Sequence, residues 1–147
     1  LQHTFKHSES AQQLAAVPGV GVLTATAVLA RAPDARHFPS PRHYAAAFGL
    51  TPRVDASANR CHLGGITKRG DGYLRTLLIH GGRSVVRSVL KKHAAGRVLT
   101  RFEHWVLGVY QRGGFNKAAV AVANKNARII GALLVSGQPY RPASPAA

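Results

Sequence analysis

The apolar positions of this chain recur mainly at intervals of three and four residues, the spacing that places side chains on one face of a helix. The pattern predicts a short helix over residues 8–16, with Ser8 as its N-cap. A second helix is expected over residues 22–31, where apolar and small side chains occupy nearly every side and indicate burial in the core. Pro33 would end this second helix, because proline cannot continue the backbone hydrogen bonding.

The next part of the chain combines a clear helix start with an irregular stretch. Ser40 is followed by proline, a pair typical of an N-cap and first helical position, and Gly49 would end this helix after about two turns. Residues 50–72 are rich in Gly, Pro, Asn and charge. They predict a loop with at most short strands, near residues 51–54 and 61–66.

A long amphipathic helix is expected over about residues 73–95, with Asp71 as its cap. Gly81 and Gly82 fall on its apolar face, where each costs about 1 kcal/mol of helix propensity but allows another backbone to approach closely. A tight helix crossing is therefore predicted at these two glycines.

Two further helices are indicated towards the end of the chain. Residues 98–110 keep a helical period up to the glycines at 113–114, and Asn116 can cap a last helix that ends near residue 136. Residues 137–147 have the Pro, Ser and Ala content of a disordered tail.

Together these elements predict a mainly α fold in a single domain over residues 1–136. It would contain a helix-hairpin-helix element over about 8–31 and an irregular basic loop or short β-hairpin over about 50–72. A helical bundle over about 73–136 would complete it.

The charge of the chain points to its partner. Twenty Lys and Arg residues face five Asp and Glu residues, which gives a formal net charge of +15. A polyanion usually compensates such an excess, so nucleic acid is the first partner to consider. A membrane partner is not expected, because the chain has one tryptophan and no apolar run near the roughly 20 residues that span a bilayer.

The cysteine and methionine content bears on location. Cys61, the single cysteine, cannot form an internal disulfide, which fits a reducing bacterial cytoplasm, in association with the nucleoid. The chain has no methionine, so we expect a fragment or processed piece of a longer protein. The eight histidines show no zinc-like spacing, and no metal site or cofactor is predicted in this chain.

The turn between the first two expected helices is a candidate phosphate contact. Gly19 and Gly21 would allow a tight turn and let backbone N–H groups at the next helix start approach a DNA phosphate. A plain helical hairpin with a glycine turn is the alternative.

A row of basic residues on the long expected helix is a second candidate. His80, Arg83, Arg87 and Lys91 are three or four residues apart and share one face, and no acid between residues 73 and 95 offsets them. They could follow a phosphate backbone. A solvated helix face is the commoner meaning of such a row.

Ser57, in the basic loop, is the candidate nucleophile. A serine hydroxyl attacks phosphorus poorly unless its proton is removed and the phosphate charge is neutralised, and the nearby Arg and Lys side chains could neutralise that charge. From chemistry alone a serine in such a loop is more often a turn residue, and Ser40, Ser84 and Ser88 are nearly as eligible. The predicted nucleic-acid contacts are Gly19, Gly21, Arg53, Arg60, Lys68, Arg69, Arg75, Arg83, Arg87 and Lys91.

Four segments, in this order, resemble the C-terminal domain of the DEDD insertion-sequence transposases, a group that includes bridge-RNA-guided recombinases. The segments are LAAVPGVGVLTATAVLA, RHFPSPRHYAAAFGLTPR, LGGITKRGDGYLRTLLIHGGRSV and NKAAVAVANKNARIIGALL. The resemblance covers about residues 14–134, and GITKRGDGYLR is its most specific part.

The resemblance implies an enzyme of two parts. An N-terminal RuvC-like domain carries four acidic residues that bind magnesium, and the C-terminal domain supplies a catalytic serine between the GLTPR-like segment and the Gly-Ile-Ser/Thr-Lys-Arg-Gly motif. Ser57 stands at that place, although Ala58 replaces the usual glycine after it. The family is thought to join DNA strands through a serine-linked intermediate, guided in some members by a bridge RNA.

These observations predict a DNA-binding, serine-bearing domain of a transposase or site-specific recombinase. The acidic domain is absent from this chain, so the isolated chain is expected to bind DNA without cutting it, and magnesium would be needed only in that domain. The complete enzyme would be a dimer or tetramer. The alternatives are a non-catalytic helix-hairpin-helix DNA-binding module and a basic RNA-binding structural protein.

Overall fold

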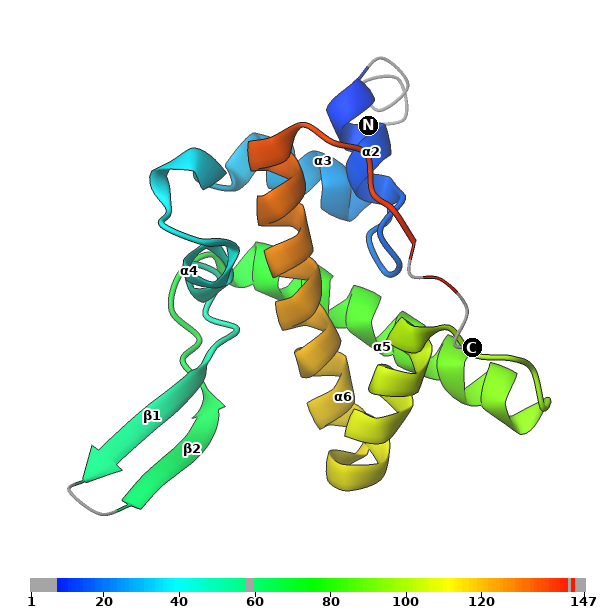
Figure 1. The fold of residues 1–147 in the computed structure, drawn as a ribbon. Helices are drawn as coiled ribbons and strands as arrows, with labels where there is room; N and C mark the ends of the chain where they lie inside the picture. The colour runs from blue at the N-terminus through cyan, green and yellow to red at the C-terminus, as the bar shows by residue number, and fades with distance from the viewer. Residues whose placement is uncertain (1–7, 58–59, 143, 145–147) are drawn as a thin grey trace.

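A computed structural model describes residues 8–57, 60–142 and 144, and for residues 55–57 and 60–63 it describes the backbone alone. The described chain is mainly helical, as predicted. Figure 1 shows the long helices α5 and α6 at the centre of the molecule and a β-hairpin that projects from the helical body beside α4. In chain order the elements are α2 (Glu9–Ala15), α3 (Val22–Arg31), the 3-10 helix η1 (Ala35–His37), α4 (Pro41–Ala46), β1 (Pro52–Ser57), β2 (Arg60–Ile66), α5 (Gly72–Ala94) and α6 (Arg101–Ser136).

Three helix starts are confirmed, with the caps that the sequence predicts. The Ser8 hydroxyl accepts a hydrogen bond from the Ala11 N–H at 3.2 Å. The Ser40 hydroxyl accepts one from the His43 N–H at 3.4 Å. The Asp71 carboxylate accepts hydrogen bonds from the Tyr73 and Leu74 N–H groups in the first turn of α5, at 2.9 and 3.1 Å. Each cap satisfies backbone donors that have no partner inside the helix.

Helix α3 is less buried than its sequence suggests. Thr24, Ala25 and Val28 lie in the core, but Leu23 and Leu29 are 46% and 39% exposed. The expectation of burial on nearly every side is therefore wrong. The helix packs against α2 and α5, and the face away from them remains open to solvent.

The stretch expected to be irregular forms a regular antiparallel hairpin. The sequence predicts at most short strands there, yet β1 extends to Ser57 and pairs with β2 from Val54 to the end of the strand. Near the base of the hairpin, the register advances by two residues along β1 and by three residues along β2. Strand β2 therefore has a β-bulge, with one extra residue in the Gly64–Gly65 region.

Helix α6 bends where the sequence predicts a break between two helices. Gly114 has φ 79° and ψ 180°, which interrupts the helix, so Asn116 lies inside the second segment and does not cap it. The first segment begins later than residue 98, because Thr100 caps it in a reciprocal capping box with Glu103. Val98 lies outside the helix and is 79% exposed.

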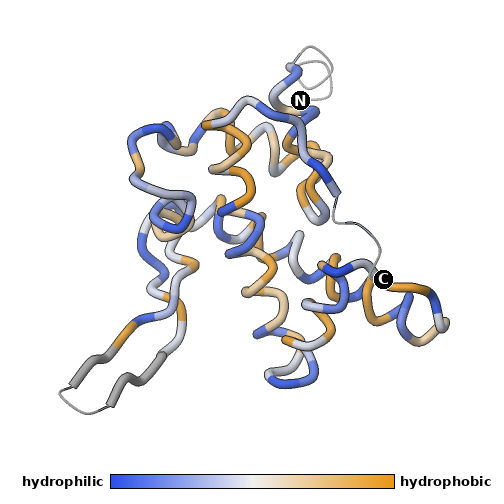
Figure 2. Tube along the Cα trace, viewed as in Figure 1, coloured by the Kyte–Doolittle hydropathy of each residue, from blue (hydrophilic) through white to orange (hydrophobic). Residues whose placement is uncertain are grey.

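Two groups of buried side chains form the core. One lies where α2, α3 and α4 meet the beginning of α5 and the end of α6, and the other lies where the second half of α5 meets the first half of α6. Figure 2 shows the hydrophobic segments concentrated on these helices. Tyr140, in the segment expected to be a disordered tail, packs against the first group.

The predicted close approach at two adjacent glycines is confirmed. A Cβ on Gly82 would lie 2.2 Å from the Ala119 carbonyl oxygen, which marks the crossing of α5 and α6. A Cβ on Gly81 would lie 1.9 Å from the Gly19 carbonyl oxygen, so Gly81 receives the α2–α3 turn.

Helix α6 is more apolar than expected. It contains an 18-residue window of mean hydropathy 1.3, long and apolar enough to cross a membrane by length and composition alone. Gly114 interrupts the helix, and much of its apolar face packs against α5 and α4. The buried residues of α6 in both core groups contribute to this hydropathy.

Candidate nucleic-acid interface

The base of the β-hairpin is fixed by two interlocked glycines. Gly49 has φ +68°, and a Cβ there would lie 2.3 Å from the Arg69 carbonyl oxygen. Gly70 has φ +85°, and a Cβ there would lie 1.8 Å from the Ala47 carbonyl oxygen. Both positions require glycine, because each combines a left-handed backbone with contact to another backbone.

Backbone hydrogen bonds extend this interlock to the strands. The Thr67 N–H donates to the Thr51 carbonyl at 3.0 Å, and the Lys68 N–H donates to the Gly49 carbonyl at 3.1 Å. Lys68 adopts φ 57°, which is uncommon for a residue with a side chain. We call the segments 47–51 and 67–70 the root of the hairpin.

Arg75 holds the root from the first turn of α5. Its guanidinium Nη1 donates to the Phe48 carbonyl at 3.1 Å and to the Arg69 carbonyl at 3.3 Å. The sequence analysis placed Arg75 among the nucleic-acid contacts, and the structure gives it these two backbone contacts. Together with Gly70 and the Asp71 cap, Arg75 gives the segment GITKRGDGYLR a structural role at the junction of the hairpin and α5.

Ser57 lies at the far end of the hairpin from this root. It is the last residue of β1 and pairs with Arg60. Since a strand rises about 3.3 Å per residue, Ser57 is about 16 Å beyond Pro52. The side chains of Ser57 and Arg60, and all of Ala58, lie outside the described residues.

The basic residues predicted to surround Ser57 are spread along the hairpin. Arg53 is an exposed residue near the start of β1, while Lys68 and Arg69 are exposed at the root. The structure therefore places these three residues towards the opposite end of the hairpin from the backbone of Ser57.

The basic row on α5 belongs to one uninterrupted helix. His80, Arg87 and Lys91 are exposed, and Arg83 is half-buried. The Arg87 guanidinium lies 5.8 Å from the centre of the Phe115 ring, a contact that steadies its side chain. From Arg83 to Lys91 the row extends about 12 Å along the helix axis.

Three carboxylates of the described part of the chain form ion pairs. Asp34 pairs with Arg36 at 2.7 Å, and this side-chain contact lowers the pKa of Asp34 to about 2. Asp71 pairs with Arg31 at 2.9 Å, and Glu103 pairs with Lys92. Among the described side chains, the cations of the α5 row have no carboxylate partner.

The two glycines of the α2–α3 turn have different surroundings. Gly19 faces α5, where a Cβ would meet the Gly81 carbonyl oxygen at 2.8 Å, so close packing explains this glycine. Gly21 has nothing within 4 Å of a Cβ and is exposed at the start of α3, without a side-chain cap. Of the two, Gly21 leaves its helix N-terminus open to a phosphate.

Asn126 secures the same turn from α6. Its side chain is 1% exposed, and its Nδ2 donates to the Pro18 carbonyl at 2.8 Å. The turn is thereby attached to the two long helices, one through Gly81 and the other through Asn126.

A groove between the base of the hairpin and α6 was missed by the sequence analysis. Its volume is about 620 Å³, and we call it the Trp105 groove. The Lys125 ammonium lies 4.3 Å from the centre of the Trp105 ring, and burial, followed by the neighbouring Arg128, lowers the pKa of Lys125. The groove is lined by Leu50, Pro52, Gly64, Gly65, Ile66, Trp105, Asn116, Lys117, Val120, Ala121, Asn124, Lys125 and Arg128.

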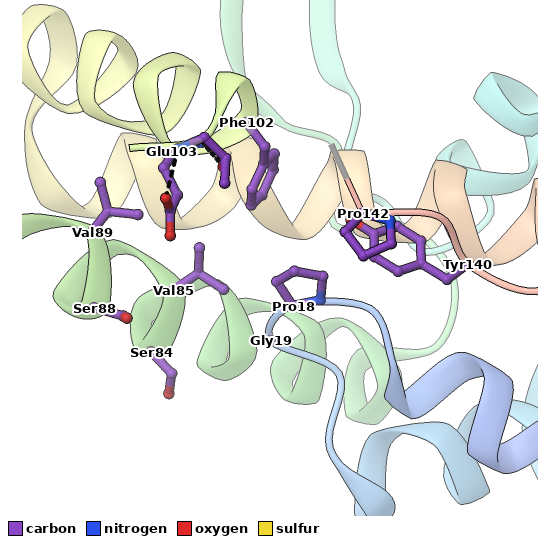
Figure 3. A pocket seen from close by; sticks show the side chains of 11 residues that line it. Pro18, Gly19, Ser84, Val85, Ser88, Val89, Phe102, Glu103, Tyr140 and Pro142 are labelled. Carbon is purple, nitrogen blue, oxygen red and sulfur yellow. Dashed lines mark hydrogen bonds between the residues drawn. The ribbon is translucent and has the colours of Figure 1, made fainter. Parts of the chain in front are cut away.

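A second pocket, of about 310 Å³, has different chemistry. Figure 3 shows Val85 and Val89 of α5 pointing towards the start of α6, with Tyr140 on the opposite side. No Lys or Arg lines it, and Glu103 does.

A metal cluster is not found in the part of the chain that the structure describes. No group of three or more His, Cys, Asp or Glu side chains there could hold an ion.

These features define a basic helical domain that displays cationic surfaces and a projecting hairpin. Residues 11–97 match the model of the family described as Transposase IS116/IS110/IS902. The chain belongs to this transposase family.

Curated relatives extend the similarity over nearly the whole chain. It is 50% identical over 131 residues to a probable family 20 transposase of Pseudomonas aeruginosa, with 89% of the chain and 37% of that protein covered. It is 43% identical over 141 residues to the transposase for insertion sequence element IS1111A of Coxiella burnetii, covering 96% and 37%. It is 34% identical over 137 residues to the transposase for insertion sequence element IS1328 of Yersinia enterocolitica, covering 93% and 39%. The chain thus spans a little over a third of the length of these relatives.

Proposed function

We propose that this chain is the DNA-binding, serine-bearing part of a transposase, acting with a RuvC-like domain in a longer protein. The observation that carries the proposal is the position of Ser57, at the end of a hairpin that projects from a basic helical body. Such a position could carry a nucleophile into a site completed by another domain. The relatives, which are named as transposases, support this role.

In this proposal the helical body holds DNA through its phosphates. Arg83, Arg87 and Lys91 follow one strand of the backbone, and the open N-terminus of α3 at Gly21 binds another phosphate. These contacts carry no base information, so they position the duplex without selecting its sequence.

Ser57 then attacks a scissile phosphate. Its oxygen forms a bond to phosphorus and a phosphorus–sugar oxygen bond breaks, which leaves one DNA end attached to serine. The hydroxyl proton passes to a water molecule or carboxylate acting as general base, and the released sugar oxygen takes up a proton. Arg53, Arg60, Lys68 and Arg69 would contact phosphates along the hairpin, and Arg53 lies nearer its base than Ser57 does.

The test of the catalytic role uses the full-length protein. Ser57→Ala should abolish strand exchange and serine-linked DNA while duplex affinity is kept, and Ser88→Ala, an exposed serine of α5, should leave both intact. Unchanged recombination by Ser57→Ala would reject the catalytic role and favour the non-catalytic DNA-binding module. The isolated chain should bind DNA without cleaving it, and magnesium-dependent cleavage by this chain alone would also contradict the proposal.

The test of the DNA contacts is a salt series. Arg87→Gln should reduce the slope of log affinity against log salt by about 1, because one phosphate contact is lost. Arg36→Gln removes the same charge from an arginine already paired with Asp34, so it should leave the slope unchanged. Equal slopes for the original chain and the Arg87 variant would exclude the α5 row.

Recombination of two DNA sites also implies a dimer or tetramer of the full-length protein, with a guide RNA in the manner of some family members. In a bacterial cell it would work in the cytoplasm, at the nucleoid. Sedimentation of the full-length protein with two DNA sites, with and without co-purified RNA, measures both features.

A further inference from the structure

We propose that the Trp105 groove binds one strand of single-stranded DNA, with an unstacked base beside Trp105. This inference rests on the proposed function, because it assigns a second DNA site to the same domain. It concerns the face between the hairpin base and α6, which is separate from the α5 row.

The dimensions of the groove suit a single nucleotide. Its volume of about 620 Å³ falls in the range of sites that enclose small molecules, roughly 300–1,000 Å³. A DNA strand would have to enter such a space as an unpaired nucleotide with its base turned out of the stack, because a base pair within a duplex is too large for it.

The residues that line the groove include both apolar and polar groups, a combination that suits the flat apolar faces and polar edges of a nucleobase. Leu50, Ile66 and Trp105 provide apolar surface on different elements, and Asn116 is exposed at the rim. Asn124 also lines the groove, with its Nδ2 held by the Leu50 carbonyl at 2.9 Å. Aromatic side chains beside basic residues are typical of proteins that bind single strands without strict sequence preference.

The charges of the groove favour an anionic ligand. Lys117, Lys125 and Arg128 line it, and no carboxylate is among its lining residues. Within the described part of the chain these three cations make no ion pair. Burial and the charge of Arg128 lower the pKa of Lys125, and a bound phosphate would offset both effects.

The arrangement of Lys125 links the base site to the phosphate site. Its ammonium lies over the Trp105 ring at 4.3 Å and near the Phe102 ring at 5.9 Å, and the two rings are stacked. A phosphate bound by Lys125 would therefore leave the attached base within reach of Trp105.

The experiment uses the fluorescence of Trp105, the one tryptophan of the chain, which lines this groove. A dT12 oligonucleotide should quench the emission in a saturable way at about 50 mM salt, whereas a 12-base-pair duplex should bind without comparable quenching. Arg128→Gln should weaken dT12 binding about tenfold, the cost of one charge-assisted hydrogen bond. Arg112→Gln, the same change on an exposed residue of α6 outside the groove, should leave dT12 affinity as it was.

Each outcome decides the inference. Absence of quenching by dT12, or an equal effect of the two arginine variants, would overturn it. Quenching by rU12 or by polyglutamate but not by dT12 would assign the groove to RNA or to an acidic protein segment and would equally overturn it. Arg128 is exposed, so its replacement should leave the helical circular dichroism unchanged, and Lys125→Gln provides a second variant inside the groove.

The inference and the proposed function fail in different ways. If duplex DNA binds but dT12 leaves the fluorescence unchanged, the groove proposal is wrong and the α5 interface stands. If dT12 quenches but duplex affinity does not respond to Arg87→Gln, the α5 interface is wrong and the groove stands.

Discussion

Gly82 allows the crossing of α5 and α6 to be tested with a single methyl group. A Cβ there would lie 2.2 Å from the Ala119 carbonyl oxygen, so the two helices must separate by about 1 Å to restore normal van der Waals contact. The neighbouring side chains are fully buried, Ala118, Ala119 and Val122 among them. Because the clashing atom is a backbone oxygen and its surroundings are buried, the strain cannot be relieved by moving a flexible side chain.

Two effects of opposite sign determine the size of the change. Over-packing of a tight core costs about 1–3 kcal/mol and sometimes more, while replacing glycine by alanine inside a helix gains about 1 kcal/mol. We expect Gly82→Ala to lower the free energy of unfolding by up to about 2 kcal/mol, and Tm by up to about 8 °C. Urea denaturation followed by circular dichroism at 222 nm measures this change.

Gly108→Ala is the matched control. Gly108 also lies inside a helix, but the nearest atom to its Cβ would be the mobile Arg112 Nη1, at 3.2 Å. This variant should be as stable as the original chain or up to about 1 kcal/mol more stable. A Gly82→Ala protein as stable as the Gly108→Ala protein would refute the reasoning.

Other predictions address the root of the hairpin, the α5 cap and the α2–α3 turn. Arg75→Met removes two hydrogen bonds to backbone carbonyls; unfolding should become easier by about 1–2 kcal/mol, and hydrogen exchange at the root amides should accelerate. The Leu74 N–H and then Arg31 hold the pKa of Asp71 below its usual value. Its stabilisation is present above the unfolded-state pKa of about 3.9 and is lost as pH falls towards the lower folded value. Between pH 6 and pH 3 the original chain should thus lose more stability than Asp71→Asn, and parallel curves would contradict this. Asn126→Ala leaves the Pro18 carbonyl without its donor and should cost about 1–3 kcal/mol in urea denaturation; the exposed Asn116→Ala should cost nothing measurable.

Local signals in the sequence were sufficient for the helices and their caps. Ser8, Ser40 and Asp71 act on N–H groups two or three residues away, so the segment itself carries the information. Gly114 shows where such signals become ambiguous. Several residues in a row could mark the break in α6, and only the backbone conformation shows which of them interrupts the helix.

Contacts between distant segments could not be predicted in the same way. The Trp105 groove joins residues 50–52, 64–66 and 105–128, and no spacing along the chain relates these segments. Gly19 illustrates the same difficulty. A glycine in a tight turn suggests a backbone that is accessible to a ligand. Here Gly19 instead allows the turn to pack against Gly81, which lies in another helix.

The sequence analysis also treated the region around Ser57 as one basic cluster. Neighbours in the sequence separate at about 3.3 Å per residue once the chain is extended, so Arg53 and Ser57 cannot gather at one point. The expectation grouped these residues in an irregular loop or short hairpin, whereas strand pairing keeps the segment extended as far as Ser57.

The interlock of Gly49 and Gly70 joins the base of the hairpin to the helical body, so any rotation at the base displaces the far end of the hairpin. A rotation of about 10° at the base would move the far end, about 16 Å away, by about 3 Å. That displacement is large beside the fraction of an ångström within which reacting atoms must be placed. Under the role proposed for Ser57, the accuracy with which the end of the hairpin meets the scissile phosphate would be set by the backbone at Gly49 and Gly70, where even one added methyl group would change the direction of the hairpin.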